Sequence, residues 1–450
     1  MGKKTDGNYA FKWQFCEDGV EIVGHDGEIG ETLVVPERFN GAPVRQIGEN
    51  AFRNCKLLTS VVLPNGLTSI GNNAFEDCLW LTSVVLPESL RTIGEGAFFF
   101  CESLSDVVLP SGLQTIGAEA FEYCDSLGDV ELPEGLKTIG SRAFEYCNLG
   151  VVKLPHSLET IGGGWDCSGF ELSETHPCLR MLDGVLFDKA GKLLIAYPGG
   201  KVGERYRVPD EIETIGESAF QNCQSLAGVV LPEGVKAIGR HAFEGCKSLV
   251  DVNFPEGLQH ILESAFYGCC SLRGIELPDN LHTLGDLAFC NCLSLESVQF
   301  PKRLQTLGKS AFCACLALKV VQLPEGLRTV EKRAFLDCKS LRTVDFPASL
   351  QTIEKSAFSG CKSLRNVDLP ESLQTIGQFA FCDCDSLESV KFHEGLQTIR
   401  QFAFFNCRSL ERIELPGSLQ AIEEAAFPDE VDFTAPEGSW AAEWIGKPRF

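Results

Sequence analysis

The residues of this chain that could carry chemistry are its 21 cysteines. A cysteine thiolate can bind a metal ion or act as a nucleophile, and two cysteines can form a disulfide. The clearest candidates for a metal site are three Cys-x-Cys pairs, Cys290/Cys292, Cys313/Cys315 and Cys382/Cys384. If the first two pairs lie on neighbouring turns of the fold, they could offer four sulfur ligands to one ion.

Most of the cysteines follow a spacing that indicates packing instead. Fourteen stand three residues after the phenylalanine of an Ala-Phe pair, namely Cys55, Cys78, Cys101, Cys124, Cys147, Cys223, Cys246, Cys269, Cys292, Cys315, Cys338, Cys361, Cys384 and Cys407. The remaining seven are Cys16, Cys167, Cys178, Cys270, Cys290, Cys313 and Cys382. Because each Cys-x-Cys pair includes one cysteine of the regular set, we interpret the pairs as core residues and predict no metal site. The odd total and the regular placement also argue against a disulfide framework.

Other candidates for chemistry are weaker. Asp166, Cys167, His176 and Cys178 resemble a ligand set, but their spacing does not match a zinc site. The seven histidines form no evident triad with a serine or cysteine nucleophile, and the sequence has no glycine-rich phosphate loop. We therefore predict no catalytic residues, no cofactor and no enzymatic activity.

These residues are positioned by an internal repeat of 23 residues. The Ala-Phe pairs end at Phe52, Phe75, Phe98, Phe121 and Phe144, and then at Phe220, Phe243, Phe266, Phe289, Phe312, Phe335, Phe358, Phe381, Phe404 and Phe427. The gap between Phe144 and Phe220 is 76 residues, which is three periods plus seven. An irregular segment is therefore inserted between two runs of repeats.

Each repeat predicts one turn of a solenoid. In the first repeat Leu58, Val61 and Leu63 suit a short strand buried on one face, and Pro64 ends it because proline cannot donate to a ladder. A second apolar pair then leads into a tight turn that carries Ala-Phe. The glycine before this turn is replaced by other residues in several repeats, so the turn does not require glycine. One such unit cannot bury its own apolar face, whereas stacked units can.

The repeats resemble the BspA-like leucine-rich repeat proteins of bacteria. The resemblance rests on stretches such as ESAFQNCQSLAGVVLPEGVKAIGRHAFEGC, residues 217–246, and it covers nearly the whole chain. It implies an α/β repeat fold, which is a right-handed leucine-rich-repeat solenoid with parallel strands, short turn helices, an inserted hairpin and terminal caps. It also implies a role for the chain as a surface protein that binds host matrix proteins or other cells.

The same resemblance divides the chain into five parts. We expect an N-terminal capping coil at 1–50, a first repeat run at 51–164, an inserted hairpin segment at 165–207, a second repeat run at 208–427 and a C-terminal cap at 428–450. In the insertion, Val185, Leu186 and Phe187 can face Leu193, Leu194 and Ile195 across a short loop. This hairpin either protrudes towards a ligand or joins the two runs, and we favour the second interpretation. In the cap, Ser439 can begin a short helix with Trp440 and Trp444 on one face.

Composition limits the possible partners. The net charge of −23 argues against nucleic acid and anionic membranes, which require a basic surface, and favours solubility or a basic partner. The chain has no apolar run long enough to cross a bilayer. Its first residues lack the apolar core of a secretion signal, so the protein is either not exported or lost a signal before Met1.

Two sets of residues could bind a partner. The outward position of each strand is Val62, Val85 and Val108 in the first repeats and mostly polar later, so these valines form either an apolar contact row or plain strand surface. Phe100, Tyr123 and Tyr146 recur two residues after the core phenylalanine, and Trp80 replaces a common serine. Tyrosine and tryptophan are frequent at binding hot spots, although these rings could also only stack on each other.

We therefore expect a protein or glycan ligand, such as an extracellular matrix protein, and a monomeric binding protein. The resemblance implies a secreted or cell-surface adhesin. The alternative is a cytoplasmic interaction scaffold, which the absence of a signal and the unpaired thiols favour.

Overall fold

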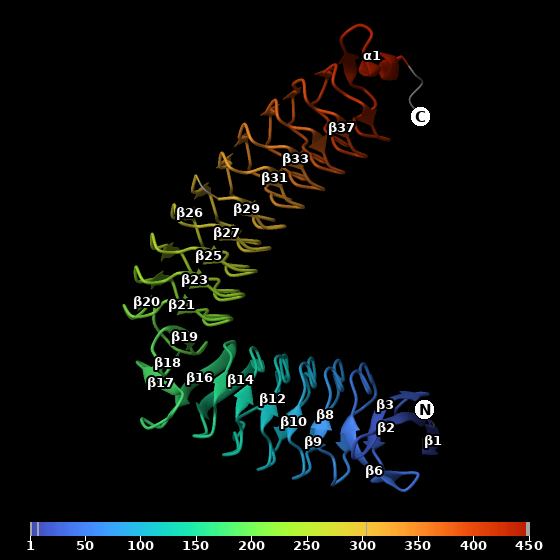
Figure 1. The fold of residues 1–450 in the computed structure, drawn as a ribbon, viewed down its shortest axis with the longest axis vertical. Helices are drawn as coiled ribbons and strands as arrows, with labels where there is room; N and C mark the ends of the chain where they lie inside the picture. The colour runs from blue at the N-terminus through green and yellow to red at the C-terminus, as the bar shows by residue number, and fades with distance from the viewer. Residues whose placement is uncertain (1, 7–8, 303, 447–450) are drawn as a thin grey trace. The chain divides into compact units, whose positions relative to one another are not determined.

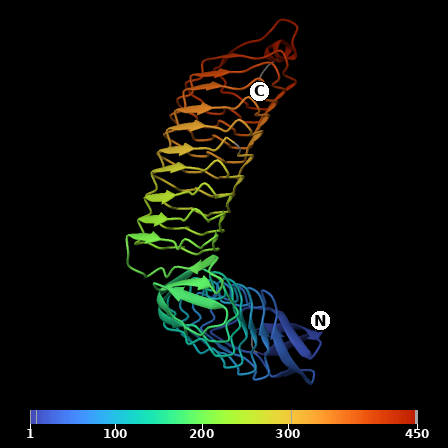
Figure 2. The ribbon, with the colours of Figure 1, turned by 60° about the vertical axis from the view of Figure 1, so that its left-hand side comes forward.

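The computed structural model describes residues 2–6, 9–302 and 304–446 (Figure 1). The chain forms two compact units. Unit 1 comprises Met1–Val202 and Gly216–Cys223, and unit 2 comprises Gly203–Ile215 and Gln224–Phe450. Both units are stacks of coils, and most regular coils contribute one longer strand and one short strand to parallel sheets (Figure 2).

Most of the longer strands carry the Val-x-Leu pattern, with an inward valine or isoleucine, while β4, β20 and β40 have Leu33, Tyr206 and Phe433 at this position. In unit 1 they are β4 (Thr32–Val34), β7 (Ser60–Val62), β9 (Ser83–Val85) and β11 (Asp106–Val107). In unit 2 they are β20 (Arg205–Arg207), β22 (Gly228–Val230), β24 (Asp251–Asn253), β26 (Gly274–Glu276), β28 (Ser297–Gln299), β30 (Val320–Gln322), β32 (Thr343–Asp345), β34 (Asn366–Asp368), β36 (Ser389–Lys391), β38 (Arg412–Glu414) and β40 (Asp432–Thr434).

The short strands hold the second apolar residue of each repeat. In unit 1 they are β8 (Ser69–Ile70), β10 (Thr92–Ile93), β12 (Thr115–Ile116), β13 (Thr138–Ile139) and β15 (Thr160–Ile161). In unit 2 they are β21 (Thr214–Ile215), β23 (Ala237–Ile238), β25 (His260–Ile261), β27 (Thr283–Leu284), β29 (Thr306–Leu307), β31 (Thr329–Val330), β33 (Thr352–Ile353), β35 (Thr375–Ile376), β37 (Thr398–Ile399) and β39 (Ala421–Ile422). Equivalent residues pair between neighbouring coils, as Ile70 does with Ile93, because every coil has the same length.

The turn that carries Ala-Phe contains no helix in the repeats that the structure describes, so the predicted short turn helices are not seen. Its residues two before and two after the phenylalanine have positive φ, for example Asn73 at 53° and Asp77 at 60°. These left-handed residues interrupt a helical run. The N–H groups of Asn73, Phe75 and Asp77 donate instead to carbonyls of the following coil at 2.8 to 2.9 Å. The glycine before the turn has no such positive φ at Gly71 or Gly94, which agrees with the prediction that the turn does not depend on it.

The core of each unit is a column of phenylalanine rings. Successive rings are nearly parallel with centroids about one coil apart, as between Phe75 and Phe98 at 5.4 Å in unit 1 and between Phe266 and Phe289 at 5.0 Å in unit 2. Burying one such ring contributes on the order of 2 kcal/mol, and stacking adds to this. The regular cysteines are buried beside the column.

The regular cysteines also donate hydrogen bonds, which the sequence analysis did not foresee. The Sγ of Cys101 is 3.3 Å from the carbonyl oxygen of Phe75, one coil earlier, and Cys315 and Phe289 repeat this contact at 3.2 Å. A cysteine is therefore favoured at this position because it is small and can satisfy a carbonyl between two coils.

The inserted segment begins with β14 (Phe144–Lys153) and β16 (Trp165–Glu171), which pair in parallel. It continues with the antiparallel strands β17 (Leu179–Leu182), β18 (Val185–Asp188) and β19 (Leu193–Ala196). Phe187 pairs with Leu194, so the hairpin forms where the sequence predicted it. Trp165 stacks on Phe144 and Tyr197 stacks on Phe220, so two other aromatic residues take the place of phenylalanine in these coils.

Unit 1 begins with β1 (Gly2–Asp6), β2 (Tyr9–Cys16), β3 (Gly19–Asp26) and β6 (Ala42–Ile47), which lead into the sheet of short strands, while β5 (Arg38–Phe39) pairs with β6. Unit 2 ends with α1 (Trp440–Ile445), where the Ser439 side chain accepts a hydrogen bond from the N–H of Ala442. Ser439 therefore caps the helix as predicted, while the last four residues of the predicted cap, 447–450, lie outside the described residues. Among the described residues, no helix is long and apolar enough to cross a membrane.

Candidate binding surface

Two of the predicted valines, Val62 and Val85, end the longer strands β7 and β9 of unit 1, and the third, Val108, directly follows β11. Val62 pairs with Val85 across β7 and β9, and the side chains of Val62, Val85 and Val108 are 49%, 73% and 75% exposed. Val34 of β4 pairs with Val62 and is 47% exposed. Val34 was not predicted from the sequence, because Val34 precedes the first regular repeat. We call Val34, Val62, Val85 and Val108 the valine row.

Phe100, Tyr123 and Tyr146 form a continuous stack on the turns of three successive coils. Their ring centroids are 4.2 Å apart between Phe100 and Tyr123 and 4.3 Å between Tyr123 and Tyr146, with nearly parallel planes. Phe99 contacts the stack edge-on. Burial, together with the neighbouring Tyr146, raises the pKa of Tyr123 above its usual value. We call Phe100, Tyr123 and Tyr146 the aromatic stack.

All three residues of the aromatic stack adopt left-handed backbone conformations, with φ of 57° to 59°. Other coils place asparagine, aspartate or glycine at this position, as at Asn54 and Gly245, or alanine at Ala314. A bulky side chain costs on the order of 1 kcal/mol there, whereas asparagine and glycine tolerate it. The stack therefore keeps three aromatic rings at positions whose backbone disfavours them.

Trp80 lies on the coil that precedes the stack and is 63% exposed. It belongs to the turn segment between Cys78 and β9, whereas the valine row lies on the strands themselves. The structure thus divides the seven predicted residues into a strand row, a turn stack and an exposed tryptophan, all within unit 1.

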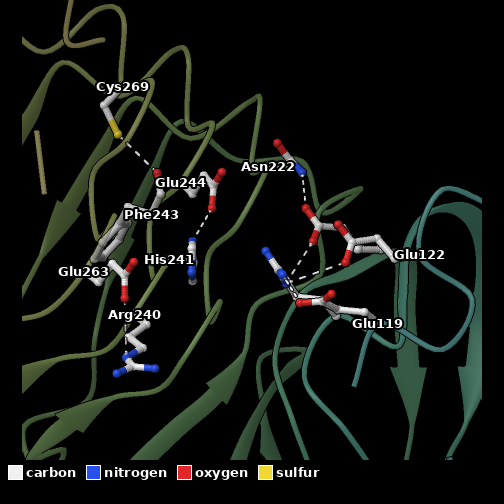
Figure 3. A network of polar contacts seen from close by, with 11 residues as sticks. Glu119, Glu122, Asn222, Arg240, His241, Phe243, Glu244, Glu263 and Cys269 are labelled. Atoms are coloured by element: carbon white, nitrogen blue, oxygen red, sulfur yellow. Dashed lines mark hydrogen bonds and ion pairs between the residues drawn. The ribbon is translucent and has the colours of Figure 1, made fainter. Parts of the chain in front are cut away.

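A buried ionic cluster lies close in sequence to the aromatic stack (Figure 3). Arg142 forms a short contact with Glu119 and lies 3.6 Å from Glu122 and 3.8 Å from Glu145. Asn222 donates a hydrogen bond to Glu145 at 2.8 Å. Burial alone would lower the pKa of Arg142, but the surrounding carboxylates raise it, so the guanidinium stays charged.

Glu122 and Glu145 precede Tyr123 and Tyr146 directly, and both glutamates are almost fully buried. The cluster can therefore fix the turns that present the two tyrosines. The ionic cluster was not predicted, because its charged residues become neighbours only when the coils stack in register. The Glu-Tyr pair that recurs at residues 122–123 and 145–146 is a signal that could have indicated it.

In unit 2 the same outward position is Val230 in β22 but polar in the strands from β24 to β38, and part of it lines a hollow of about 780 Å³. Asp345, Asp368 and Lys391 contribute from β32, β34 and β36, and His393 stands where most repeats have proline. Asp368 lies 2.8 Å from Nε2 of His393 and 3.3 Å from Nζ of Lys391. The hydrogen bond to His393, assisted by Lys391, lowers the pKa of Asp368.

The residues considered for metal binding are engaged in other contacts. Cys292 and Cys315 donate to backbone carbonyls, and Cys290 and Cys313 contact each other on neighbouring coils. His176 is fully buried: its Nε2 donates to the carbonyl of Pro155, and its Nδ1 accepts from two backbone N–H groups. These contacts support the structural interpretation of His176. The described part of the chain contains no group of three or more His, Cys, Asp or Glu side chains that could hold a metal ion.

The stacked parallel strands, the phenylalanine column and the repeated leucine positions define a leucine-rich-repeat protein. The family model of the BspA type leucine rich repeat region matches residues 45–165, 204–319 and 305–433, in six copies. Since these matches span most of the chain, the protein belongs to the BspA-type leucine-rich-repeat family. A comparison with curated proteins finds no match.

Solved structures with similar folds are bacterial. A leucine-rich repeat protein from Bacteroides ovatus is 27% identical, with 95% of this chain and 98% of that chain covered and a TM-score of 0.47. The pneumococcal vaccine antigen PcpA is 21% identical, with 84% and 93% covered and a TM-score of 0.53. A leucine-rich repeat protein from Eubacterium ventriosum is 23% identical, with 83% and 92% covered and a TM-score of 0.52. The last two similarities show the shared repeat fold.

Proposed function

We propose that this chain is a non-enzymatic binding protein that recognises a protein or glycan through unit 1, with the valine row, the aromatic stack and Trp80 as its contact residues. The observation that carries the proposal is the aromatic stack at left-handed positions. Its three rings stand at positions that other coils fill with asparagine, aspartate, glycine or alanine, so the repeat itself does not require aromatic residues there. Large aromatic rings are the side chains that most often dominate binding energy.

The valine row supports the same proposal. Val34, Val62 and Val85 are in register on one sheet face, Val108 directly follows β11, and all four are exposed. Such a row is more than scattered exposed residues, and binding surfaces are often apolar at their centre. The equivalent face of unit 2 carries Asp345, Asp368 and Lys391 instead. We therefore assign the apolar contact to unit 1.

A binding screen tests the proposal. The purified full chain is applied to immobilised extracellular matrix proteins and to a glycan array, at physiological salt. Saturable binding to at least one probe, weakened by Trp80→Ser with an unchanged melting temperature, supports the proposal. Binding that is unaffected by Trp80→Ser, Tyr123→Asn and Val85→Lys would contradict the assigned surface, and no binding to any probe would contradict the ligand class.

We further propose that the protein acts at the cell surface or after secretion, as its family membership suggests. The second candidate function is an intracellular interaction scaffold, and one observation favours it: none of the 21 cysteines, all of them among the described residues, forms a disulfide. Free thiols are typical of reducing compartments. Protease treatment of intact producing cells, followed by mass spectrometry, distinguishes the two. Release of repeat peptides without cytosolic markers supports the surface location, whereas full protection of the repeats supports the scaffold.

A further inference from the structure

The cysteine at the N-terminal end of the regular series has a different partner from the others. Cys78 and Cys101 donate to the carbonyl of the phenylalanine one coil earlier. Before Cys55 the corresponding ring is His25, which stacks on Phe52 with centroids 5.9 Å apart and an interplanar angle of 9°. Nε2 of His25 lies 3.6 Å from Sγ of Cys55.

The geometry of His25 suits an acid–base role towards this thiol. Its Nδ1 lies 2.9 Å from the carbonyl oxygen of Gly27, so Nδ1 carries a proton and donates it in this hydrogen bond. Nε2 is then free to accept the thiol proton of Cys55. A cysteine and a histidine within reach, with the histidine oriented by a third group, is the arrangement that activates thiol nucleophiles.

Cys55 is less deeply buried than the other regular cysteines. It is 6% exposed, whereas the other thirteen cysteines of the series are 0% exposed. His25 is half-buried at the same edge.

We propose that Cys55 and His25 form a reactive thiol site, at which a small electrophile such as a peroxide modifies the N-terminal end of the cysteine series. In the reaction, His25 takes the proton of Cys55, and the thiolate sulfur attacks one oxygen of the peroxide. The O–O bond breaks, the sulfur becomes a sulfenic acid, and the leaving oxygen takes the proton from His25 and departs as water. The sulfur is oxidised by two electrons and the peroxide is reduced.

The charged and titratable groups around the pair agree with this assignment. A hydrogen bond from the Cys78 thiol, followed by the contact with His25, lowers the pKa of Cys55 to about 6. The contact with Cys55 in turn raises the pKa of His25, against the effects of burial and of Lys12. Lys12 forms an ion pair with Asp26 at 2.5 Å, which reduces its influence. The Cys78 thiol has only one proton, and the carbonyl oxygen of Phe52, which lies 3.3 Å from Sγ of Cys78, competes with Cys55 for it. The test therefore changes His25, the other group that lowers the pKa of Cys55.

The test is the pH dependence of alkylation at Cys55 in the full chain, with iodoacetamide as the probe and peptide mass spectrometry as the readout. We expect a midpoint below pH 7 in the wild type. The matched variant is His25→Phe, which keeps a ring on Phe52 but removes the base, and we expect its midpoint above pH 8, near that of an ordinary thiol. Cys16 serves as the reference in the same sample, because burial raises its pKa.

Three results would overturn the proposal. The first is a midpoint of Cys55 alkylation at or above pH 8.5 in the wild type, which contradicts the proposal even if His25→Phe does not fold. The second is the same profile in both proteins, and the third is no labelling of Cys55 while Cys16 reacts. As a second readout, hydrogen peroxide with dimedone at pH 6.5 should give a Cys55 adduct that His25→Phe reduces about tenfold. An equal adduct in both proteins would also contradict the proposal.

Discussion

At the scale of single residues, Tyr123 balances two opposing contributions to stability. Its left-handed backbone costs on the order of 1 kcal/mol, while its contacts with Phe100 and Tyr146 contribute about 0.5 to 1.5 kcal/mol each. We therefore expect Tyr123→Asn to change the free energy of unfolding by less than about 2 kcal/mol, as measured by urea denaturation.

The control for Tyr123→Asn is Ala314→Asn. Ala314 has φ of 57° at the same position of its own coil, and replacing it also relieves strain but removes no stacked ring. It should stabilise the protein by up to about 1 kcal/mol. If Tyr123→Asn stabilises the protein as much as Ala314→Asn does, the stack contributes nothing to folding.

Arg142 provides a second test at this scale. Replacing it with methionine leaves Glu122 and Glu145 buried without their main counter-charge, so we expect unit 1 to lose about 3 kcal/mol of stability. Arg53→Met is the matched control, since the Arg53 side chain is half exposed beside Glu76 and should cost less than about 1 kcal/mol. Equal losses in the two variants, measured by urea denaturation, would show that the cluster is not a structural anchor.

The sequence predicted the outward valines and the repeated rings but not the contacts that depend on register. Val34 and His25 lie before the first regular repeat, so no periodic pattern marks them. The contact of Arg142 with three glutamates arises only when neighbouring coils are stacked. The assignment of the seven predicted residues to partner binding stays a prediction, because binding depends on the ligand as well as on the chain.

At the scale of elements, the cysteine series makes stability dependent on alkaline pH. Burial raises the pKa of nine regular thiols, namely Cys101, Cys124, Cys147, Cys269, Cys292, Cys315, Cys338, Cys361 and Cys384. A pKa raised in the folded state gives stability that is complete below the unfolded pKa of about 8.5 and is lost as pH rises towards the folded value.

We therefore expect these nine thiols to add no pH dependence to the free energy of unfolding between pH 6 and 8, and to make it fall steeply above pH 9. Each thiol should contribute about 1.4 kcal/mol per pH unit to the slope. Urea denaturation at several pH values measures how steeply the free energy of unfolding falls with pH. Cys338→Ala should reduce this slope by the contribution of one thiol, about 1.4 kcal/mol per pH unit. A stability that is flat up to pH 10 would contradict the account of the buried series.

The end of unit 2 depends on a short helix. Trp444 of α1 contacts Phe433 of β40 with ring centroids 5.5 Å apart, and Phe433 contacts the core ring Phe427. We propose that α1 caps the last coil and protects β40, because an uncovered strand edge favours self-association. Trp444→Ala should raise the apparent mass in light scattering at high concentration, whereas Glu443→Ala, an exposed change on the same helix, should not. A monomeric Trp444→Ala protein would contradict the capping role.

Strand positions were predictable because the alternation of apolar residues recurs in every repeat. The turn was not, since Asn, Asp, Ser and larger residues all occupy its left-handed positions, so composition does not reveal them. The insertion was predicted as a hairpin from its apolar pairs, but Trp165 and Tyr197 were not recognised as substitutes for the core phenylalanine. The predicted boundaries at residues 50, 164, 207 and 427 stay predictions.

At the scale of the whole molecule, fold and function differ in how far sequence determines them. A period of 23 residues over most of the chain specifies a solenoid, because each coil must match its neighbours. The same regularity hides the binding site, since every coil offers an outward surface. We therefore propose that a ligand binds at departures from the repeat, such as the valine row, the aromatic stack and Trp80.

The central claim is that these departures in unit 1 bind the partner. The most direct measurement is the Kd for the matrix protein or glycan retained in the screen, compared between Val85→Lys/Val108→Lys and the matched control Gln299→Lys/Gln322→Lys, which places the same charges at the same outward position of unit 2. We predict that the first variant raises Kd at least tenfold, because two lysines are placed within an apolar contact, while the control changes it less than threefold. Equal Kd values for both variants, with both proteins folded, would contradict the claim.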